Sequence, residues 1–305
     1  MQRSESQKIP IAVVVITQNE QANIQCCLRA VSGWASEIYV VDSFSTDDTA
    51  KIAEAEGAVV ALHQFYDWAS QRDWALDNLP LKTEWVLFLD ADEQITPPFK
   101  EQVDSALAAV ASDVSAFYVY FDFVFLGRCL RHGYESPPVI RLIRRGKARW
   151  SGVGAREYCE VDGRVLDIRS HIWHEDHKGL TAWIEKQNRN ATREARVLFE
   201  RKTQARQHES VAKTSERKWR VWLRSSLYDR LPLFVRPLLY FSYRYILRGG
   251  FLDGYAGLAY TFLQGFWLTF LIDAKYYELK LTAKQAQTLS SVGEPNHSVE
   301  NKETH

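Results

Sequence analysis

The sequence contains little cysteine and no excess of charge of either sign. Of its 305 residues four are cysteines, and 38 basic residues balance 38 acidic ones. The cysteines lack the spacing of a zinc site or of a disulfide framework, so we expect reduced thiols in a cytosolic setting. Balanced charge gives no general attraction for nucleic acid. The polar first eight residues also lack the apolar middle of a secretory signal.

Common nucleotide-binding and metallohydrolase motifs are missing as well. No G-x-G-x-x-G follows the first predicted strand, and no G-x-x-x-x-G-K-[ST] occurs anywhere. Dinucleotide-binding and P-loop domains therefore lose their main support. Histidines and acids crowd residues 171–177 without the H-E-x-x-H spacing, which disfavours a zinc hydrolase.

What the chain does contain is enough apolar sequence for a large core, since 46% of its residues are hydrophobic. Apolar, β-prone runs at residues 9–17, 37–42, 58–63 and 85–89 alternate with helical stretches. This alternation predicts an α/β fold with a mostly parallel, doubly wound sheet and right-handed crossovers.

The run at 85–89 passes directly into Asp90, Asp92 and Glu93. An apolar run of this kind indicates a strand buried on both faces, and carboxylates at its C-terminal end lie where open α/β sheets bind ligands. Asp90 and Asp92 point to the same side of an extended chain. Such a pair suits Mg²⁺ or Mn²⁺ holding a diphosphate, although a polar turn closing the strand is the simpler alternative.

Several segments together resemble family-2 glycosyltransferases. Residues 14–20, 40–49 and 89–93 resemble the three signatures of that family, in the same order and at similar separations. Residues 70–76 resemble the segment before its D-x-D strand, and residues 139–146 its R-L-[FI]-R-R-G hairpin. Within the family, the sequence is most similar to bacterial enzymes that build lipopolysaccharide core or other envelope glycans.

The resemblance implies a GT-A fold, a nucleotide-sugar donor and Mn²⁺ or Mg²⁺. Residues 17–20 would cradle the base and ribose, Asp42 would accept a hydrogen bond from the base, and Arg72 would lie near the diphosphate. The implied donor-binding residues are Thr17, Asn19, Glu20, Asp42, Arg72, Asp90 and Ala91. Ser43 replaces an acid that such families often carry, which leaves uridine and guanosine both open.

Asp92 and His174 are the implied metal ligands, and Glu157 the implied catalytic base. Neutral imidazole suits Mn²⁺ beside carboxylates, but His174 could equally be an ordinary hydrogen-bonded loop histidine. Relatives commonly have His-Glu where this chain has Arg156 and Glu157. One carboxylate must take the proton of the acceptor hydroxyl. Glu157 could instead form a surface pair with an arginine, in which case Asp122 and Glu135 are the reserve candidates.

The last third of the chain differs in composition. Basic and aromatic residues interleave between 217 and 248, and residues 255–272 carry no charge. This pattern indicates helices that lie in or re-enter a membrane interface, since 18 residues is the lower limit for a span. An apolar helix covering the catalytic domain or a dimer face is the alternative. We expect a catalytic domain at 9–200, a helical membrane-associating extension at 201–281 and a disordered tail at 282–305.

The sequence therefore predicts an inverting, metal-dependent glycosyltransferase. It would move a hexose from a nucleotide-diphosphate sugar, with UDP as the first choice, to a lipid-linked, lipopolysaccharide or exopolysaccharide acceptor. We expect it at the cytoplasmic face of the inner membrane, as a peripheral or monotopic protein. The alternative is a catalytically silent sugar-nucleotide-binding scaffold. A nucleotidyltransferase is disfavoured, because residues 17–21 do not form a triphosphate-gripping loop.

Overall fold

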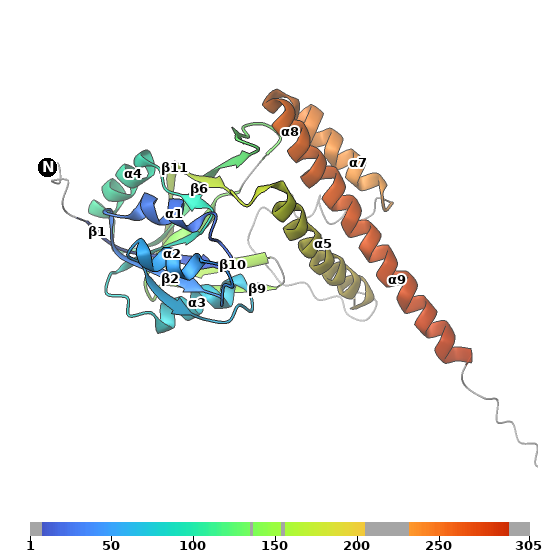
Figure 1. The fold of residues 1–305 in the computed structure, drawn as a ribbon, viewed down its shortest axis with the longest axis horizontal. Helices are drawn as coiled ribbons and strands as arrows, with labels where there is room; N and C mark the ends of the chain where they lie inside the picture. Colours follow the sequence, from blue (N-terminus) through green and yellow to red (C-terminus); the bar gives the residue numbers. More distant parts are fainter. Residues whose placement is uncertain (1–7, 135–136, 154–155, 205–231, 293–305) are drawn as a thin grey trace, which may run out of the picture.

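The computed structural model describes residues 8–134, 137–153, 156–204 and 232–292. Its centre is a nine-stranded sheet in the order β3-β2-β1-β4-β8-β6-β11-β5, with β7 paired to β6 (Figure 1). These strands are β1 (Ile9–Thr17), β2 (Ala35–Asp42), β3 (Val59–Leu62), β4 (Trp85–Asp90), β5 (Glu93–Gln94), β6 (Val114–Phe125), β7 (Arg128–Cys129), β8 (Val139–Arg144) and β11 (Arg164–Glu175). A separate hairpin joins β9 (Ala148–Val153) and β10 (Arg156–Val161).

The predicted parallel α/β sheet is confirmed, with the parallel arrangement strongest in its first half. Strands β3, β2, β1 and β4 are all parallel. Strand β8 then runs antiparallel to both β4 and β6, while β6 and β11 are parallel. The carboxyl ends of β1, β2 and β4 therefore meet at one edge, where the predicted donor residues lie.

Helices and a hairpin cover the two faces of this sheet. One core contains side chains of β1 and β4 with those of α1 (Ile24–Val31), α2 (Thr49–Ala55) and α4 (Pro97–Ala108). The opposite core joins the sheet to α3 (Trp68–Asn78) and to the β9–β10 hairpin. A capping box between Asp67 and Ser70 begins α3, and Thr96 caps α4 ahead of two prolines. These caps fix where each helix begins relative to the sheet edge.

The C-terminal helices form a second body beside the sheet (Figure 1). They are α5 (Gly179–Gln204), α7 (Val235–Ser242), the π-helical η2 (Tyr243–Leu247), the 3₁₀ turn η3 (Gly250–Asp253), α8 (Gly254–Tyr260), the π-helical η4 (Thr261–Trp267) and α9 (Leu268–Val292). We refer to residues 235–292 as the helical unit. Helix α5 packs along α9, and a third apolar cluster around Phe125, Trp183 and Tyr260 joins the unit to the sheet.

Two predicted boundaries fall inside helices. Helix α5 continues through Gln204, so residue 200 lies inside a helix. Residues 282–292 belong to α9, so the expected disordered tail is helical over that stretch. The basic-aromatic residues 217–224 and the last residues, 293–305, lie outside the described residues.

One helical stretch in the described part of the chain, Gly250–Gln285, is long and apolar enough to cross a membrane by length and composition. Only 28% of its most apolar window is buried inside the protein. The predicted membrane-contacting residues 255–272 lie within it.

Candidate functional site

The ends of β1 and β2 are held together by a buried hydrogen bond. Thr17 lies opposite Asp42 in the sheet register, and its hydroxyl donates to Asp42 Oδ1 at 2.9 Å. The backbone amide and hydroxyl of Ser45 donate to the same carboxylate at 2.8 and 2.5 Å. Asp42 is therefore a buried carboxylate with donors on both oxygens, fixed in one orientation at the sheet edge.

The loops that follow these two strands are also connected. Asn19 adopts a left-handed backbone conformation with φ 55°. Its side-chain oxygen accepts from the Thr46 amide at 2.8 Å, and its own amide donates to Ser45 Oγ at 2.8 Å. The structure thus brings Thr17, Asn19 and Asp42 together into one wall, as the sequence predicted, while their contact with a base stays a prediction.

Glu20 has partners that the sequence did not reveal. It forms an ion pair with Lys178, and Asn23 Nδ2 donates to its Oε2 at 2.8 Å. The same Asn23 nitrogen donates to Asp176 at 2.9 Å. Asn23 occupies the N-cap position of α1 without a side-chain capping bond, and its Oδ1 instead accepts from the His177 amide at 2.8 Å, just after β11. Burial raises the pKa of Glu20, against the opposing effects of Lys178 and Asn23.

Two buried arginines flank Asp90 at the end of β4. Arg141 Nη2 donates to Asp90 Oδ2 at 2.8 Å and to Glu93 Oε1 at 3.2 Å. Arg72, which is 1% exposed, donates to Asp90 Oδ1 at 3.2 Å and pairs with Glu157. Within the described residues, the Nε atoms of both arginines lack a hydrogen-bond partner. Buried donors in this state are unusual, and the Nε of Arg144, outside this cluster, is in the same state.

Asp92 faces His174 across the same edge. Pairing of β5 with β11 places His174 opposite Glu93, and the Glu175 amide donates to the Asp92 carbonyl at 2.9 Å. Asp92 Oδ2 consequently lies 3.3 Å from His174 Nε2. Ala91, between Asp90 and Asp92 in the chain, is 3% exposed. The two predicted metal ligands, 82 residues apart in the chain, are therefore neighbours in the fold.

The electrostatics of this pair respond to the surrounding carboxylates. Burial alone would lower the pKa of His174, but its hydrogen bond to Asp92 and the nearby acids raise it to about 9. Burial would raise the pKa of Asp92, yet His174 and Lys186 bring it well below its usual range. Burial and the charges of Asp90 and Asp92 raise the pKa of Glu93, although Arg141 opposes them. The folded state therefore holds a proton on His174 and keeps Asp92 ionised.

The donor set fits a divalent metal that shares its coordination with a substrate. No group of three or more His, Cys, Asp or Glu side chains in the described ranges is arranged to hold a metal alone. Asp92 and His174 supply one oxygen and one nitrogen, and Mg²⁺ or Mn²⁺ commonly completes such sites with phosphate oxygens and water. The cluster also has more acids than arginines to match them. Its carboxylates are Asp90, Asp92, Glu93 and Glu157, and its guanidiniums are Arg72 and Arg141.

The predicted base Glu157 lies on β10 at the far side of Arg72. One third of its side chain is exposed, so the carboxylate is accessible while Arg72 orients it. The reserve candidate Asp122 instead accepts from His171 at 2.6 Å, away from the Asp92–His174 pair. Glu135, the other reserve, lies outside the described residues. Glu157 is therefore the best-placed of the described candidates.

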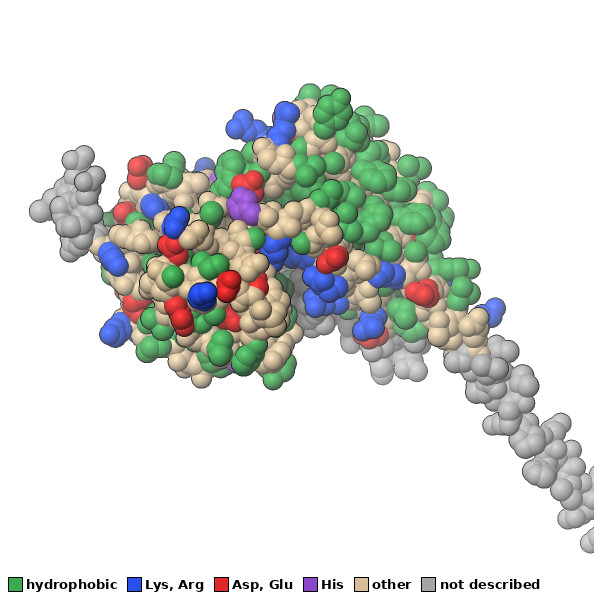
Figure 2. Space-filling model, viewed as in Figure 1, with side chains coloured by type: hydrophobic (Ala, Val, Ile, Leu, Met, Phe, Trp, Pro, Cys, Tyr) green, Lys and Arg blue, Asp and Glu red, His purple; other side chains and the backbone are tan. Residues whose placement is uncertain are grey.

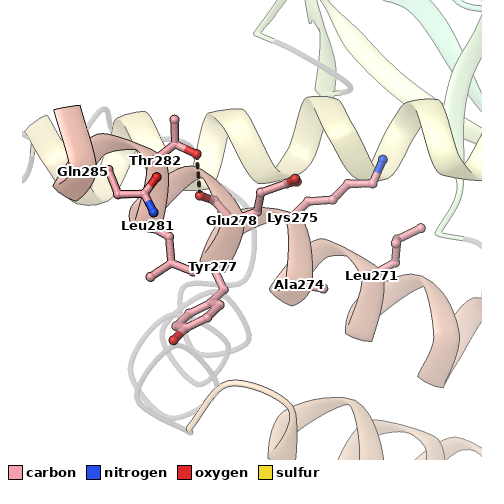
Figure 3. Close-up of a pocket in the computed structure, with 8 residues that line it drawn as sticks. All are labelled: Leu271, Ala274, Lys275, Tyr277, Glu278, Leu281, Thr282 and Gln285. Atoms are coloured by element: carbon pink, nitrogen blue, oxygen red, sulfur yellow. Dashed lines mark hydrogen bonds between the residues drawn. The ribbon is translucent and has the colours of Figure 1, made fainter.

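A surface hollow of about 600 Å³ along α9 is not part of this site. Figure 3 shows that the eight residues drawn around it come from one helix, between Leu271 and Gln285. Thr282 donates to the Glu278 carbonyl there at 3.1 Å, an ordinary intrahelical contact. Because one helix wall supplies few converging polar groups, we place the candidate site at Asp92 instead.

Three residues of the site were missed at the sequence level. Arg141 lies within the hairpin motif at residues 139–146, but that motif gave no reason to expect Asp90 and Glu93 beside it. Lys178 and Lys186 flank the start of α5, and acids of the site raise the pKa of Lys186 in spite of its partial desolvation. Lys178 directly precedes α5 and Lys186 lies within it. These two lysines after the strand that carries His174 are the one sequence signal that could have indicated them.

Comparisons with known proteins found one matching family model and relatives that are named glycosyltransferases. The model of glycosyl transferase family 2 matches residues 12–154. An uncharacterized glycosyltransferase of Rickettsia bellii is 34% identical over 103 residues, which is 34% of each chain. The chain thus matches about a third of the length of this relative. The lipopolysaccharide core biosynthesis glycosyltransferase LpsC of Rhizobium meliloti is 25% identical over 84% of this chain and 90% of its own.

Among solved structures, the chain is similar to glucosyl-3-phosphoglycerate synthase from Mycobacterium tuberculosis in complex with Mn²⁺ and UDP-glucose. The identity is 25%, the match covers 36% of this chain and 43% of that one, and the TM-score is 0.32.

Proposed function

We propose that this chain, whose residues 12–154 match the model of glycosyl transferase family 2, transfers a hexose with inversion from a nucleotide-diphosphate sugar. The observation that carries the proposal is the meeting of Asp92 and His174 beside Asp90 at the edge where β1, β2 and β4 end. UDP is the first nucleotide to test, with the Asp42 wall as the proposed base site.

Each residue of the cluster has a proposed task. Thr17, Asn19 and Asp42 form the proposed wall for base and ribose, and the guanidinium groups of Arg72 and Arg141 are the proposed positive charges near the phosphates. Asp92 and His174 would hold Mn²⁺ or Mg²⁺. When bound, the metal would neutralise charge on the leaving diphosphate.

Glu157 is the proposed general base. Its carboxylate takes the proton of the acceptor hydroxyl while that oxygen bonds to the anomeric carbon. The bond from that carbon to the diphosphate breaks, its electron pair leaves with the nucleotide, and the configuration inverts. Arg72 contacts both Glu157 and Asp90, so it would fix the position of the Glu157 carboxylate relative to the donor sugar. Charge-assisted contacts of this kind give geometric specificity as well as energy.

The proposal also includes the acceptor and the location. A relative over most of the chain is named for lipopolysaccharide core biosynthesis, which supports a lipid-linked or lipopolysaccharide acceptor. Exposed apolar residues of the helical unit support attachment at the cytoplasmic face of the cell membrane. Donor, acceptor and membrane surface are thus the proposed partners.

The test is donor binding and slow donor hydrolysis by the purified full chain with UDP-, GDP- and dTDP-sugars, with and without Mn²⁺. We expect one donor to bind only with metal and Asp92→Ala to abolish that binding. Glu157→Gln, which can still hydrogen-bond to Arg72, should keep donor affinity and lose roughly 10²–10⁴-fold in turnover. Glu160→Gln, on the same strand and exposed, is the matched control and should turn over normally.

Two results would count against the proposal. Normal turnover by Asp92→Ala would remove the metal role of that residue. Donor binding without hydrolysis, equal in wild type and Glu157→Gln, would support the catalytically silent scaffold instead.

A further inference from the structure

The turn that joins η2 to α8 exposes large apolar side chains at one end of the helical unit. Tyr255 is 92% exposed and Leu247 77%. We call residues 246–255 the wedge, and its exposed apolar members are Ile246, Leu247, Phe251, Leu252 and Tyr255. Figure 2 shows apolar side chains gathered over α7, α8 and the adjoining part of α9. A contiguous exposed apolar patch of this kind marks an interaction surface.

The wedge is held firmly against the catalytic domain. Asp253, 3% exposed, accepts from the amides of Arg131 and His132 at 3.3 and 2.8 Å. The Gly133 amide donates to the Arg248 carbonyl at 3.1 Å. A Cβ on Gly133 would lie 2.9 Å from the Cα of Gly250, so the two backbones touch. The apolar side chains are therefore presented by a preorganised turn rather than by a loose loop.

Cationic side chains surround the wedge. Arg128, Arg131 and Arg248 are exposed, and Figure 2 shows Lys and Arg side chains at the edge of the apolar region beside α8. Residues 126–134 and 243–260 contain a single acid, Asp253, and it is buried. Because the whole chain has balanced charge, this surface is a local concentration of positive charge on an apolar base.

We infer that the wedge inserts into the headgroup–acyl boundary of an anionic bilayer, with Arg128, Arg131 and Arg248 binding lipid phosphates. Apolar side chains with basic neighbours are the pattern of interfacial insertion. A second copy of the chain fits less well, since a two-fold contact would bring the arginines against themselves. A full span is disfavoured because α9 continues with Asp273, Lys275 and Glu278. The inference deepens the proposed function, on which its membrane location rests.

The wedge is connected to the candidate site by aromatic rings. Tyr260, at the end of α8, lies 5.1 Å from the ring of Phe123, and Phe123 lies 5.3 Å from His174. Insertion of the wedge would therefore keep the Asp92–His174 edge at a fixed position relative to the bilayer surface. A lipid-anchored acceptor would meet the site at that height.

The experiment is flotation of the full chain with phosphatidylcholine vesicles and with vesicles containing one quarter phosphatidylglycerol, at low and high salt. We expect the anionic vesicles to bind the protein, less at high salt. Leu247→Glu with Tyr255→Glu should weaken partitioning at least ~10-fold. Arg131→Ala with Arg248→Ala should weaken the anionic preference roughly 25-fold. Val59→Glu, at an exposed apolar site on β3, is the control and should bind like wild type.

Four results would overturn the inference. The first two are no flotation of the wild type and full flotation of the Leu247→Glu, Tyr255→Glu variant. The third is a wild-type dimer in light scattering that becomes monomeric in this variant. The fourth is retention in cell membranes after alkaline carbonate, which indicates a span. Donor hydrolysis by the same variants separates this failure from that of the proposed function. If the protein hydrolyses the donor but does not bind vesicles, only the inference about the wedge fails. If it binds vesicles but does not hydrolyse the donor, only the proposed transferase function fails.

Discussion

Two buried arginine–carboxylate clusters in this molecule differ in how completely their charges are matched. In the helical unit, Arg236 Nε donates to both oxygens of Asp273, at 2.8 and 2.9 Å, and the Phe234 amide donates to the same carboxylate at 3.0 Å. At the sheet edge, acids outnumber arginines and the Nε atoms of Arg72 and Arg141 have no partner among the described residues. A closed pair serves packing, whereas an open cluster is poised to take up a ligand.

The largest effect that would test this comparison is on stability. Asp273→Ala removes the buried carboxylate to which Arg236 donates, and should cost about 3–5 kcal/mol of unfolding free energy. Arg236→Met with Asp273→Leu removes both charges and should recover most of that loss. Urea unfolding measures both. The exposed pair of Arg164 and Asp113 supplies the control, since Asp113→Ala should leave the unfolding midpoint unchanged. A stable Asp273→Ala protein would show that the closed pair contributes little.

A smaller effect is expected at the open cluster, and on binding rather than folding. His174→Gln removes one proposed metal ligand and should weaken Mn²⁺ binding, with UDP present, by roughly 10–100-fold. Electron paramagnetic resonance of free Mn²⁺ measures this affinity. His171→Gln is the matched control, because His171 lies on the same strand but pairs with Asp122. Equal losses in both variants would point to a general effect on β11 instead of a metal ligand.

The same comparison explains what the sequence could predict. The β4 run and its acids were predictable, because an apolar strand and its polar end are local features of the chain. Arg141 beside Asp90 was not, because it requires β8 to pair antiparallel with β4 across 51 residues of sequence. Asp273 was equally hidden, since its partner Arg236 lies 37 residues earlier, on another helix. Motif resemblance pointed to Asp92, His174 and Arg72, but gave no reason to expect Arg141 beside Asp90.

The smallest expected effect is a pH dependence of stability in the metal-free protein. The raised pKa of His174, about 9 against an ordinary 6.5, means that the folded state binds this proton more tightly than the unfolded state. Its contribution is complete below about pH 6.5 and is lost as the pH rises through about 9. Because 28% of the His174 side chain is exposed, solvent screening reduces this contribution. We expect about 1–2 kcal/mol of unfolding free energy, or roughly 2–5 °C in Tm.

Thermal unfolding between pH 6.5 and 9 measures this contribution, and His174→Gln should lack it. A metal reverses the sign, because Mn²⁺ binds the neutral imidazole and competes with the proton. With Mn²⁺ and UDP present, the stabilisation by ligand should therefore grow over the same pH range. Were the metal-free wild type and His174→Gln to lose stability in parallel, the titrating proton would belong to another group, and the carboxylates around His174 would not hold its proton in the folded state.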